Sequence, residues 1–181
     1  MATSELVRRA RDGDRDAYDV LVTASVDAMY RVARLILRDY DSASDAVQEA
    51  LVRCWRDLPR LRDPDRFDAW LNRILVRAIT DEARSRQRSR VRLAVVPIVT
   101  QPDGSAALAD RDELARVFGR LSIEHRTIVV LHHYLGMTPD EAASTIGIPV
   151  GTAKSRLHYA IEALRAALDA DARLSTGRAS A

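Results

Sequence analysis

The sequence has one cysteine, few aromatic residues and no long apolar run, and each shortage excludes a class of protein. Only 5% of the 181 residues are aromatic while 47% are hydrophobic, so aliphatic side chains and alanine must form most of the core. The single cysteine, Cys54, falls in an apolar helical stripe and is expected to be a small buried hydrophobe. Because no Cys/His spacing is typical of a zinc site either, we expect neither a disulfide framework nor a metal or other cofactor.

Glycine and proline are also scarce, with seven and six residues, and most of them stand at the apparent ends of elements, which favours helices. The N-terminus has no apolar signal core and no run approaches the length of a membrane span. We therefore expect a cytoplasmic protein with no membrane insertion. The formal net charge is only +2, so any affinity for nucleic acid must come from local patches.

Hydrophobic periodicity predicts an all-α fold of two small helical domains joined by a flexible linker. In the first domain, residues 1–90, a short helix over 3–11 precedes a helix that follows Asp14. The next helix is expected to open at Ser42, with Asp45 as its capping partner, and to end at Pro59. Its predicted inward-facing residues are Val47, Leu51, Cys54, Trp55 and Leu58, and those of a third long helix, starting near Asp65, are Phe67, Trp70, Leu71, Ile74 and Ala78.

Residues 91–109 interrupt the periodicity and indicate a linker. The apolar run Leu93–Val99 within it is compatible with a strand, but it has no visible pairing partner, and an extended tether that contacts a partner is the preferred interpretation. The helical pattern returns at Asp110 and defines a second domain over residues 110–170. A small, polar tail over residues 171–181 is expected to be disordered.

The second domain contains a predicted helix-turn-helix over residues 138–168. Thr138 is suited to cap the first helix, with Pro139 at its first position and Glu141 as the reciprocal capping acid, and Gly147 ends it. The second helix has an apolar stripe and a polar face whose N-terminal half is rich in hydrogen-bond donors, as reading of a DNA major groove requires. That face contains Thr152, Lys154, Ser155, Arg156, His158 and Tyr159.

A second basic feature is a run of arginines at alternate positions near the end of the first domain. Such a run is compatible with a solvated helix end or with contact to DNA phosphates. Its members are Arg84, Arg86, Arg88, Arg90 and Arg92.

Two segments resemble sigma factors of the extracytoplasmic-function group of the sigma-70 family. The stretch from Pro149 to Leu157, PVGTAKSRL, is similar to the family's recognition helix. The stretch Asp45–Glu49, DAVQE, followed by Trp55, resembles the region 2 helix that binds core RNA polymerase. The N-terminal half resembles the family over nearly its whole length, so two matched domains, in the family's order and joined by a tether, together cover roughly residues 10–168.

This resemblance implies a role for each polar face. It implies that Asp45, Gln48 and Glu49 bind core RNA polymerase. It also implies that the donor face on the second helix of the helix-turn-helix reads the promoter's minus-35 element. It also implies regulation by an anti-sigma factor as a further partner. The residues implied to bind the minus-10 element are Arg60, Arg62, Asp63, Arg66, Arg73, Arg77 and Arg84.

Three positions depart from the family pattern. Arg77 stands where an asparagine is usual, so base choice at the minus-10 element cannot be carried over. Tyr159 replaces a frequent arginine, which leaves the minus-35 sequence open. Pro149 replaces a frequent serine and offers no side-chain cap.

Other function classes have less support. An enzyme is not expected, because there is no glycine-rich phosphate loop and no His-Glu-x-x-His or di-iron motif, and the adjacent His132 and His133 should point in different directions. A stand-alone helix-turn-helix regulator and a protein-binding helical adaptor remain alternatives to a sigma factor that directs core polymerase to promoter DNA.

Overall fold

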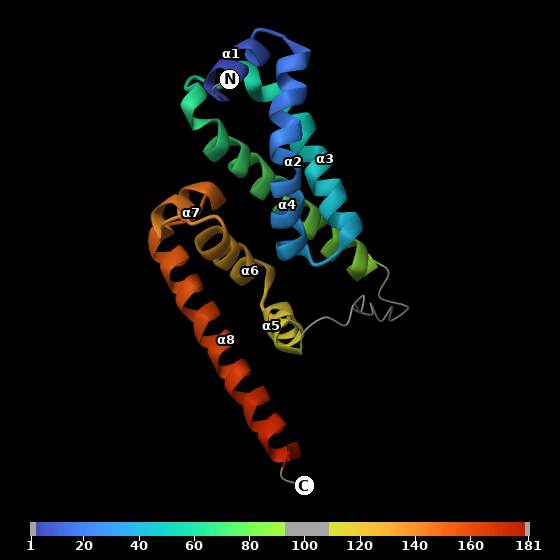
Figure 1. Ribbon diagram of the computed structural model, residues 1–181, viewed down its shortest axis with the longest axis vertical. Coiled ribbons are helices and arrows are strands. Elements are labelled where there is room, and N and C mark those ends of the chain that lie inside the picture. The colour runs from blue at the N-terminus through green and yellow to red at the C-terminus, as the bar shows by residue number, and fades with distance from the viewer. Residues whose placement is uncertain (1–2, 93–108, 180–181) are drawn as a thin grey trace. The chain divides into compact units, whose positions relative to one another are not determined.

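The computed structural model describes residues 3–92 and 109–179, with side chains described for 3–88 and 115–170. Every regular element in these ranges is helical (Figure 1), and the chain divides into two compact units, which consist mainly of residues 1–88 and of residues 89–181. The predicted all-α fold of two helical domains is thereby confirmed. The segment predicted as linker, with the apolar run Leu93–Val99, lies almost wholly outside the described residues. None of the described helices has the length and apolarity needed to cross a membrane.

The first unit contains four α-helices and two short 3-10 turns. The helices are α1 (Thr3–Arg11), α2 (Arg15–Leu37), α3 (Tyr40–Asp57) and α4 (Phe67–Arg92), and the turns Leu58–Arg60 and Pro64–Arg66 lie between α3 and α4. The helix α2 packs along α3, and α1 packs against α2 and both turns. The predicted helix stop at Pro59 is confirmed, whereas α4 begins two residues later than expected because Pro64–Arg66 forms a 3-10 turn first.

The start of α3 differs from the prediction. Asp14 caps α2 as expected by accepting a hydrogen bond from the Ala17 N–H at 3.0 Å, but α3 begins at Tyr40 rather than at Ser42. Its cap is Asp39, whose Oδ1 accepts from the Ser42 N–H at 2.8 Å, while Ser42 is buried within the helix. The reason is the tightness of the turn, since Arg38 ends α2 in the left-handed region at φ 57° and leaves only Asp39 before α3.

The Asp39 cap makes the stability of this unit depend on pH. The Ser42 N–H above all, and then Arg86 at 2.7 Å, hold the pKa of Asp39 below its usual value against the opposing effect of partial burial. A depressed folded-state pKa contributes stability above the unfolded-state pKa, about 3.9, and this contribution is lost as pH falls through the folded-state pKa.

We expect Asp39→Asn to lower the free energy of unfolding by about 1 kcal/mol at pH 7, because asparagine still caps the helix but has no charge for the helix end or for Arg86. Below pH 4 the difference in the free energy of unfolding between the variant and the unmodified protein should shrink. Urea unfolding at pH 7 and at pH 3 measures this difference at each pH, and the same difference at both would refute this role of the charge.

The inward face of α3 confirms most of the predicted core. Cys54 is buried, as expected, and burial raises the pKa of its thiol to about 11. The prediction for Trp55 was wrong, since 39% of this residue is exposed. Cys54 takes the inward position, and the adjacent Trp55 lies at the edge of the helix pair, where its ring meets Tyr18 edge-on with centroids 4.7 Å apart. The Tyr18 O–H in turn donates to the Leu51 carbonyl at 2.8 Å.

The second unit contains α5 (Ala109–Arg120), α6 (Ile123–Val129), α7 (Pro139–Ile146) and α8 (Val150–Ala179), with a π-helical turn over Val130–Tyr134. Both α5 and α6 pack against α8. The helix α8 continues to Ala179, whereas the sequence predicted a disordered tail from residue 171. The segment beyond that point has no proline, and Ala172, Arg173 and Leu174 favour a helix.

The π-helical turn changes how the two neighbouring histidines lie. Regular helical spacing predicts that their rings diverge, but the rings of His132 and His133 meet edge-on with centroids 4.6 Å apart. The His132 Nδ1 donates to the Met137 carbonyl at 2.6 Å, which ties the end of the turn to the segment before α7. A carbonyl can only accept, so Nδ1 carries the proton in this bond.

Candidate nucleic-acid and partner interfaces

The first helix of the helix-turn-helix begins at a complete capping box. The Thr138 N–H and Oγ1 both donate to the Glu141 carboxylate, at 2.8 and 2.9 Å, and the Glu141 N–H donates back to Thr138 Oγ1 at 3.2 Å. These bonds, with the Thr138 N–H contributing most, lower the pKa of Glu141. The predicted start of α7 is confirmed at this position.

The turn between α7 and α8 is fixed by a glycine with a positive φ. Gly147 adopts φ 80°, and the following Ile148 N–H donates back to the Ala143 carbonyl at 3.1 Å, which satisfies the end of α7. The Pro149 carbonyl then accepts from the Ala153 N–H at 3.1 Å as α8 begins. Small buried residues on both helices, Ala142 and Ala143 on α7 and Ala153 and Ala160 on α8, contribute to the core of this unit.

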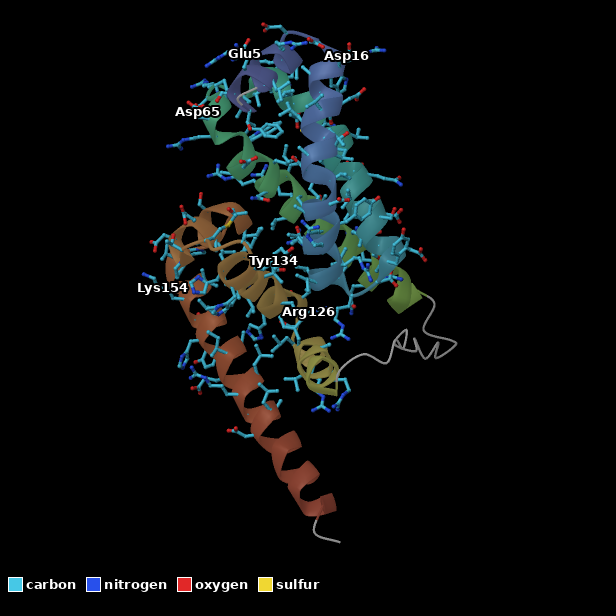
Figure 2. All side chains as sticks on the ribbon, viewed as in Figure 1. Glu5, Asp16, Asp65, Arg126, Tyr134 and Lys154 are labelled. Atoms are coloured by element: carbon cyan, nitrogen blue, oxygen red, sulfur yellow. The ribbon has the colours of Figure 1, made fainter. Side chains whose placement is uncertain are left out.

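The donor face of α8 is largely open to solvent over its first three turns. Lys154, Ser155, His158 and Tyr159 are exposed, with 63% of Tyr159 accessible, and Thr152 is half-buried. The Lys154 ammonium, labelled in Figure 2, has one loose ion pair, to Asp140 at 3.9 Å. Exposed donors therefore gather where the helix N-terminus would approach DNA.

Arg156 differs from the other predicted members of this face. It is half-buried, and it lies close enough to Glu124 of α6 for its charge to act on that carboxyl. Although partial burial raises the pKa of Glu124, hydrogen bonds from its own backbone N–H and from Ser122, with the charge of Arg156, lower it overall. This proximity gives Arg156 an electrostatic interaction with α6 in the folded protein.

The exposed face of α3 combines polar residues with one apolar residue. Asp45, Gln48 and Glu49 are all exposed, as predicted, and Val52 lies on the same face at intervals of seven, four and three residues from them. With 61% of its surface accessible, Val52 is a large apolar group in a polar patch, and the sequence pattern did not predict its exposure. We call these four residues, with Val52 as the apolar member, the α3 face.

The Glu49 carboxylate on this face is already engaged within the protein. It pairs with Arg53 at 2.7 Å, and Arg53 also pairs with Asp81 of α4 at 2.9 Å. The hydrogen bond to Glu49, and after it the hydrogen bond to Asp81, raises the pKa of Arg53 above its usual value. Asp45 and Val52 are therefore the members of the α3 face best placed to meet a partner directly.

The loop between α3 and α4 alternates buried apolar residues with exposed arginines. Leu58, Leu61 and Phe67 are buried and anchor the loop to the core. The three residues that we call the loop arginines, Arg60, Arg62 and Arg66, are exposed. Asp63, also predicted to bind DNA, caps the turn Pro64–Arg66 by accepting from the Asp65 N–H at 3.1 Å, and its carboxylate lies 3.5 Å from Arg66.

A further basic surface runs along α4. Arg73, Arg77, Arg84 and Arg88 are exposed and follow one another at intervals of four, seven and four, which places them on one side of the helix; we call them the α4 arginine stripe. Arg86 belongs to the alternating run but turns to Asp39 instead, at 2.7 Å. The side chains of Arg90 and Arg92 lie outside the described residues.

Comparison with known proteins identifies related chains for both units. A family model described as Sigma-70 region 2 matches residues 21–89, and one described as Sigma-70, region 4 matches residues 111–164. The chain is 33% identical over 159 residues to the RNA polymerase sigma-E factor of Streptomyces avermitilis, covering 86% of this chain and 89% of that protein. It is 36% identical over 148 residues to the ECF RNA polymerase sigma factor SigL of Mycobacterium tuberculosis, covering 77% and 82%.

Two solved structures are similar over most of the chain. CnrH, in complex with the cytosolic domain of CnrY, superposes with a TM-score of 0.67 at 31% identity and covers 94% of this chain and 99% of that one. The sigma factor RpoE from Bartonella quintana, in complex with the anti-sigma factor NepR, superposes with a TM-score of 0.69 at 25% identity and covers 85% and 98%.

Proposed function

This chain belongs to the sigma-70 family, as an RNA polymerase sigma factor of the extracytoplasmic-function type, and from that premise we propose how its surfaces recruit polymerase and bind a promoter. A sigma factor directs core RNA polymerase to promoters so that transcription can begin. We place this work in the cytoplasm, where bacterial polymerase and chromosomal DNA meet. The work consists of binding, with no covalent step carried out by this chain.

The α3 face is the surface that binds core polymerase. An exposed carboxylate at Asp45 and an amide at Gln48 suit a basic partner surface, and Val52 supplies an apolar contact between polar neighbours. The exposure of all three side chains in the free protein supports this assignment.

The loop arginines and the α4 arginine stripe bind the melted minus-10 strand. Guanidinium groups pair with phosphates and also stack on unpaired bases. The two sets lie on consecutive segments of one unit, the loop and the helix that it leads into. Arg77, which stands where an asparagine is usual, makes the base preference at this element a property to be measured for this chain.

The donor face of α8 reads the minus-35 element as duplex DNA. Lys154, Ser155, His158 and Tyr159 are the exposed donors on the N-terminal half of this helix. Arg156, through its interaction with Glu124, helps to hold α8 against α6. An anti-sigma factor is a further partner of this chain, which the complex of the related sigma factor RpoE with the anti-sigma factor NepR supports.

The observation that carries the proposal is that sigma regions 2 and 4 are both present, in order, each with most of its predicted polar residues exposed. The test is transcription in vitro with purified bacterial core polymerase over a pool of random promoter fragments, with and without this protein. We expect discrete new start sites that disappear when Asp45, Gln48 and Glu49 are replaced by alanine. No transcripts, with tight binding of the protein alone to a duplex site, would instead establish a stand-alone regulator.

A further inference from the structure

The N-terminal helix α1 lies against the loop that carries the loop arginines. Leu6, Val7 and Ala10 of α1 are buried, and α1 packs against the turns Leu58–Arg60 and Pro64–Arg66 as well as against α2 (Figure 1). The match to region 2 begins only at residue 21, so α1 precedes the segment that defines the family. It nevertheless packs directly against the proposed DNA-binding loop.

One hydrogen bond joins the two segments directly. The Ser4 hydroxyl donates to Asp65 Oδ1 at 2.6 Å across 61 residues of sequence, and Figure 2 shows Asp65 beside α1. On its other side, the Asp65 N–H donates to Asp63 Oδ1 at 3.1 Å, and the Arg66 N–H donates to the Asp63 carbonyl at 3.1 Å. The turn that ends in Arg66 is thus held both by its own cap and by α1.

The consequence concerns the free energy of ordering the loop. A loop that must be ordered on binding loses affinity through lost conformational entropy, whereas a loop already held in place does not. The buried Leu58, Leu61 and Phe67 fix the base of this loop, but the turn Pro64–Arg66 contains no buried residue of its own. The contact with α1 therefore adds a long-range restraint to the local cap by Asp63 on the segment that presents Arg66.

We propose that α1 acts as a brace, by which we mean that it holds the loop between α3 and α4 in its binding conformation. Ser4 and Asp65 are positioning residues, because their hydrogen bond holds Arg66 in place to bind the melted strand. This inference rests on the proposed role of the loop arginines in DNA binding. Neither Ser4 nor Asp65 contacts DNA in this scheme; each acts through the position of the turn.

Substitutions at Asp65 separate the hydrogen bond from the charge. Asp65→Asn keeps an oxygen that accepts from Ser4 but removes the carboxylate charge, whereas Asp65→Ala removes both. Holoenzyme made with each variant is titrated with a fluorescent single-stranded minus-10 oligonucleotide from a promoter found in the transcription test. We expect Asp65→Ala to bind about two- to fivefold more weakly than Asp65→Asn, which follows from the loss of one hydrogen bond.

Substitutions at Ser4 complete the test. Ser4→Ala should weaken binding by the same factor, Ser4→Thr should restore it, and Asp65→Ala should bind as well as Asp65→Asn once Ser4→Ala is present. Glu5→Gln is the matched control, since exposed Glu5 of α1 pairs with Arg8 at 2.8 Å rather than with the loop. Affinity for core polymerase and for minus-35 duplex should stay unchanged in all of these variants.

Three results would overturn the brace. Equal binding by Asp65→Asn and Asp65→Ala would assign the effect to charge alone, and unchanged binding by Ser4→Ala would remove the bond from the mechanism. A parallel loss of core and minus-35 binding in Ser4→Ala would show a general structural role only. If Arg62→Ala and Arg66→Ala also bind normally, the proposed DNA role of the loop itself fails, which distinguishes that failure from failure of the brace.

Discussion

Val52→Glu should weaken binding to core RNA polymerase at least ~100-fold while leaving this sigma factor folded. The expectation follows from the place of Val52 among Asp45, Gln48 and Glu49, where it is the apolar member of the α3 face. At the apolar contact proposed for Val52 a carboxylate would have no cation opposite it, and burying an unpaired carboxylate costs about 3 kcal/mol or more, while each 1.4 kcal/mol is a factor of ten in affinity. The fold should tolerate the change, because Val52 is mostly exposed and glutamate favours a helix more than valine does.

The measurement is fluorescence anisotropy of the labelled protein titrated with core polymerase, with thermal unfolding by circular dichroism as a check on the fold. Two controls bracket the result. Val52→Thr keeps the shape without a charge and should weaken binding only a few-fold. Val20→Glu puts the same charge on another exposed valine, on α2, outside the α3 face. Equal losses for Val20→Glu and Val52→Glu would remove the special role of the α3 face.

The sequence predicted the helices better than it predicted their ends. The apolar spacing in α4 and α8 is strong enough to identify each helix and its buried side, because burial of one face dominates the free energy of such a helix. The start of α3 was missed because Asp39 and Ser42 are both good capping residues, and the choice between them depends on how α2 ends. The π-helical turn at His132 likewise has no signal in the apolar pattern.

The candidate site was predictable as a set of exposed polar side chains but not as a network. Resemblance and helical spacing located Asp45, Lys154 and Arg77 on open faces. They could not show that Arg53, which pairs with Glu49 one helical turn away, also pairs with Asp81 of α4, because long-range ion pairs depend on where helices distant in sequence come to lie. The exposure of Val52 was not predicted for a related reason, since an apolar residue near an apolar stripe cannot be distinguished in the sequence from a residue of the core.

The same distinction between exposed and engaged arginines leads to the second prediction. Arg77 and Arg84 of the α4 arginine stripe are exposed, and Arg84 has only a loose ion pair, to Asp81 at 4.0 Å. Arg86 on the same helix, by contrast, pairs with Asp39 at 2.7 Å. Each contact to a phosphate of single-stranded DNA contributes about 0.7 to the slope of log affinity against log salt. At 0.1 M salt, relative to 1 M, this amounts to about fivefold in affinity for each contact and about 25-fold for two.

Replacing Arg77 and Arg84 together by alanine is therefore expected to weaken minus-10 binding by holoenzyme about 25-fold at 0.1 M salt and to reduce the salt slope by about 1.4. Titrating a single-stranded minus-10 oligonucleotide at several salt concentrations gives both quantities. Repeating the titration with altered base sequences separates phosphate contacts, whose loss weakens binding to all sequences equally, from base contacts, whose loss depends on the sequence.

Arg86→Ala is the matched control, because it removes the same charge from the same helix at a position engaged with Asp39. It should lower thermal stability and leave the slope unchanged. A slope that falls equally in both variants would mean that total charge governs binding, and a slope that falls in neither would place the melted strand on another surface.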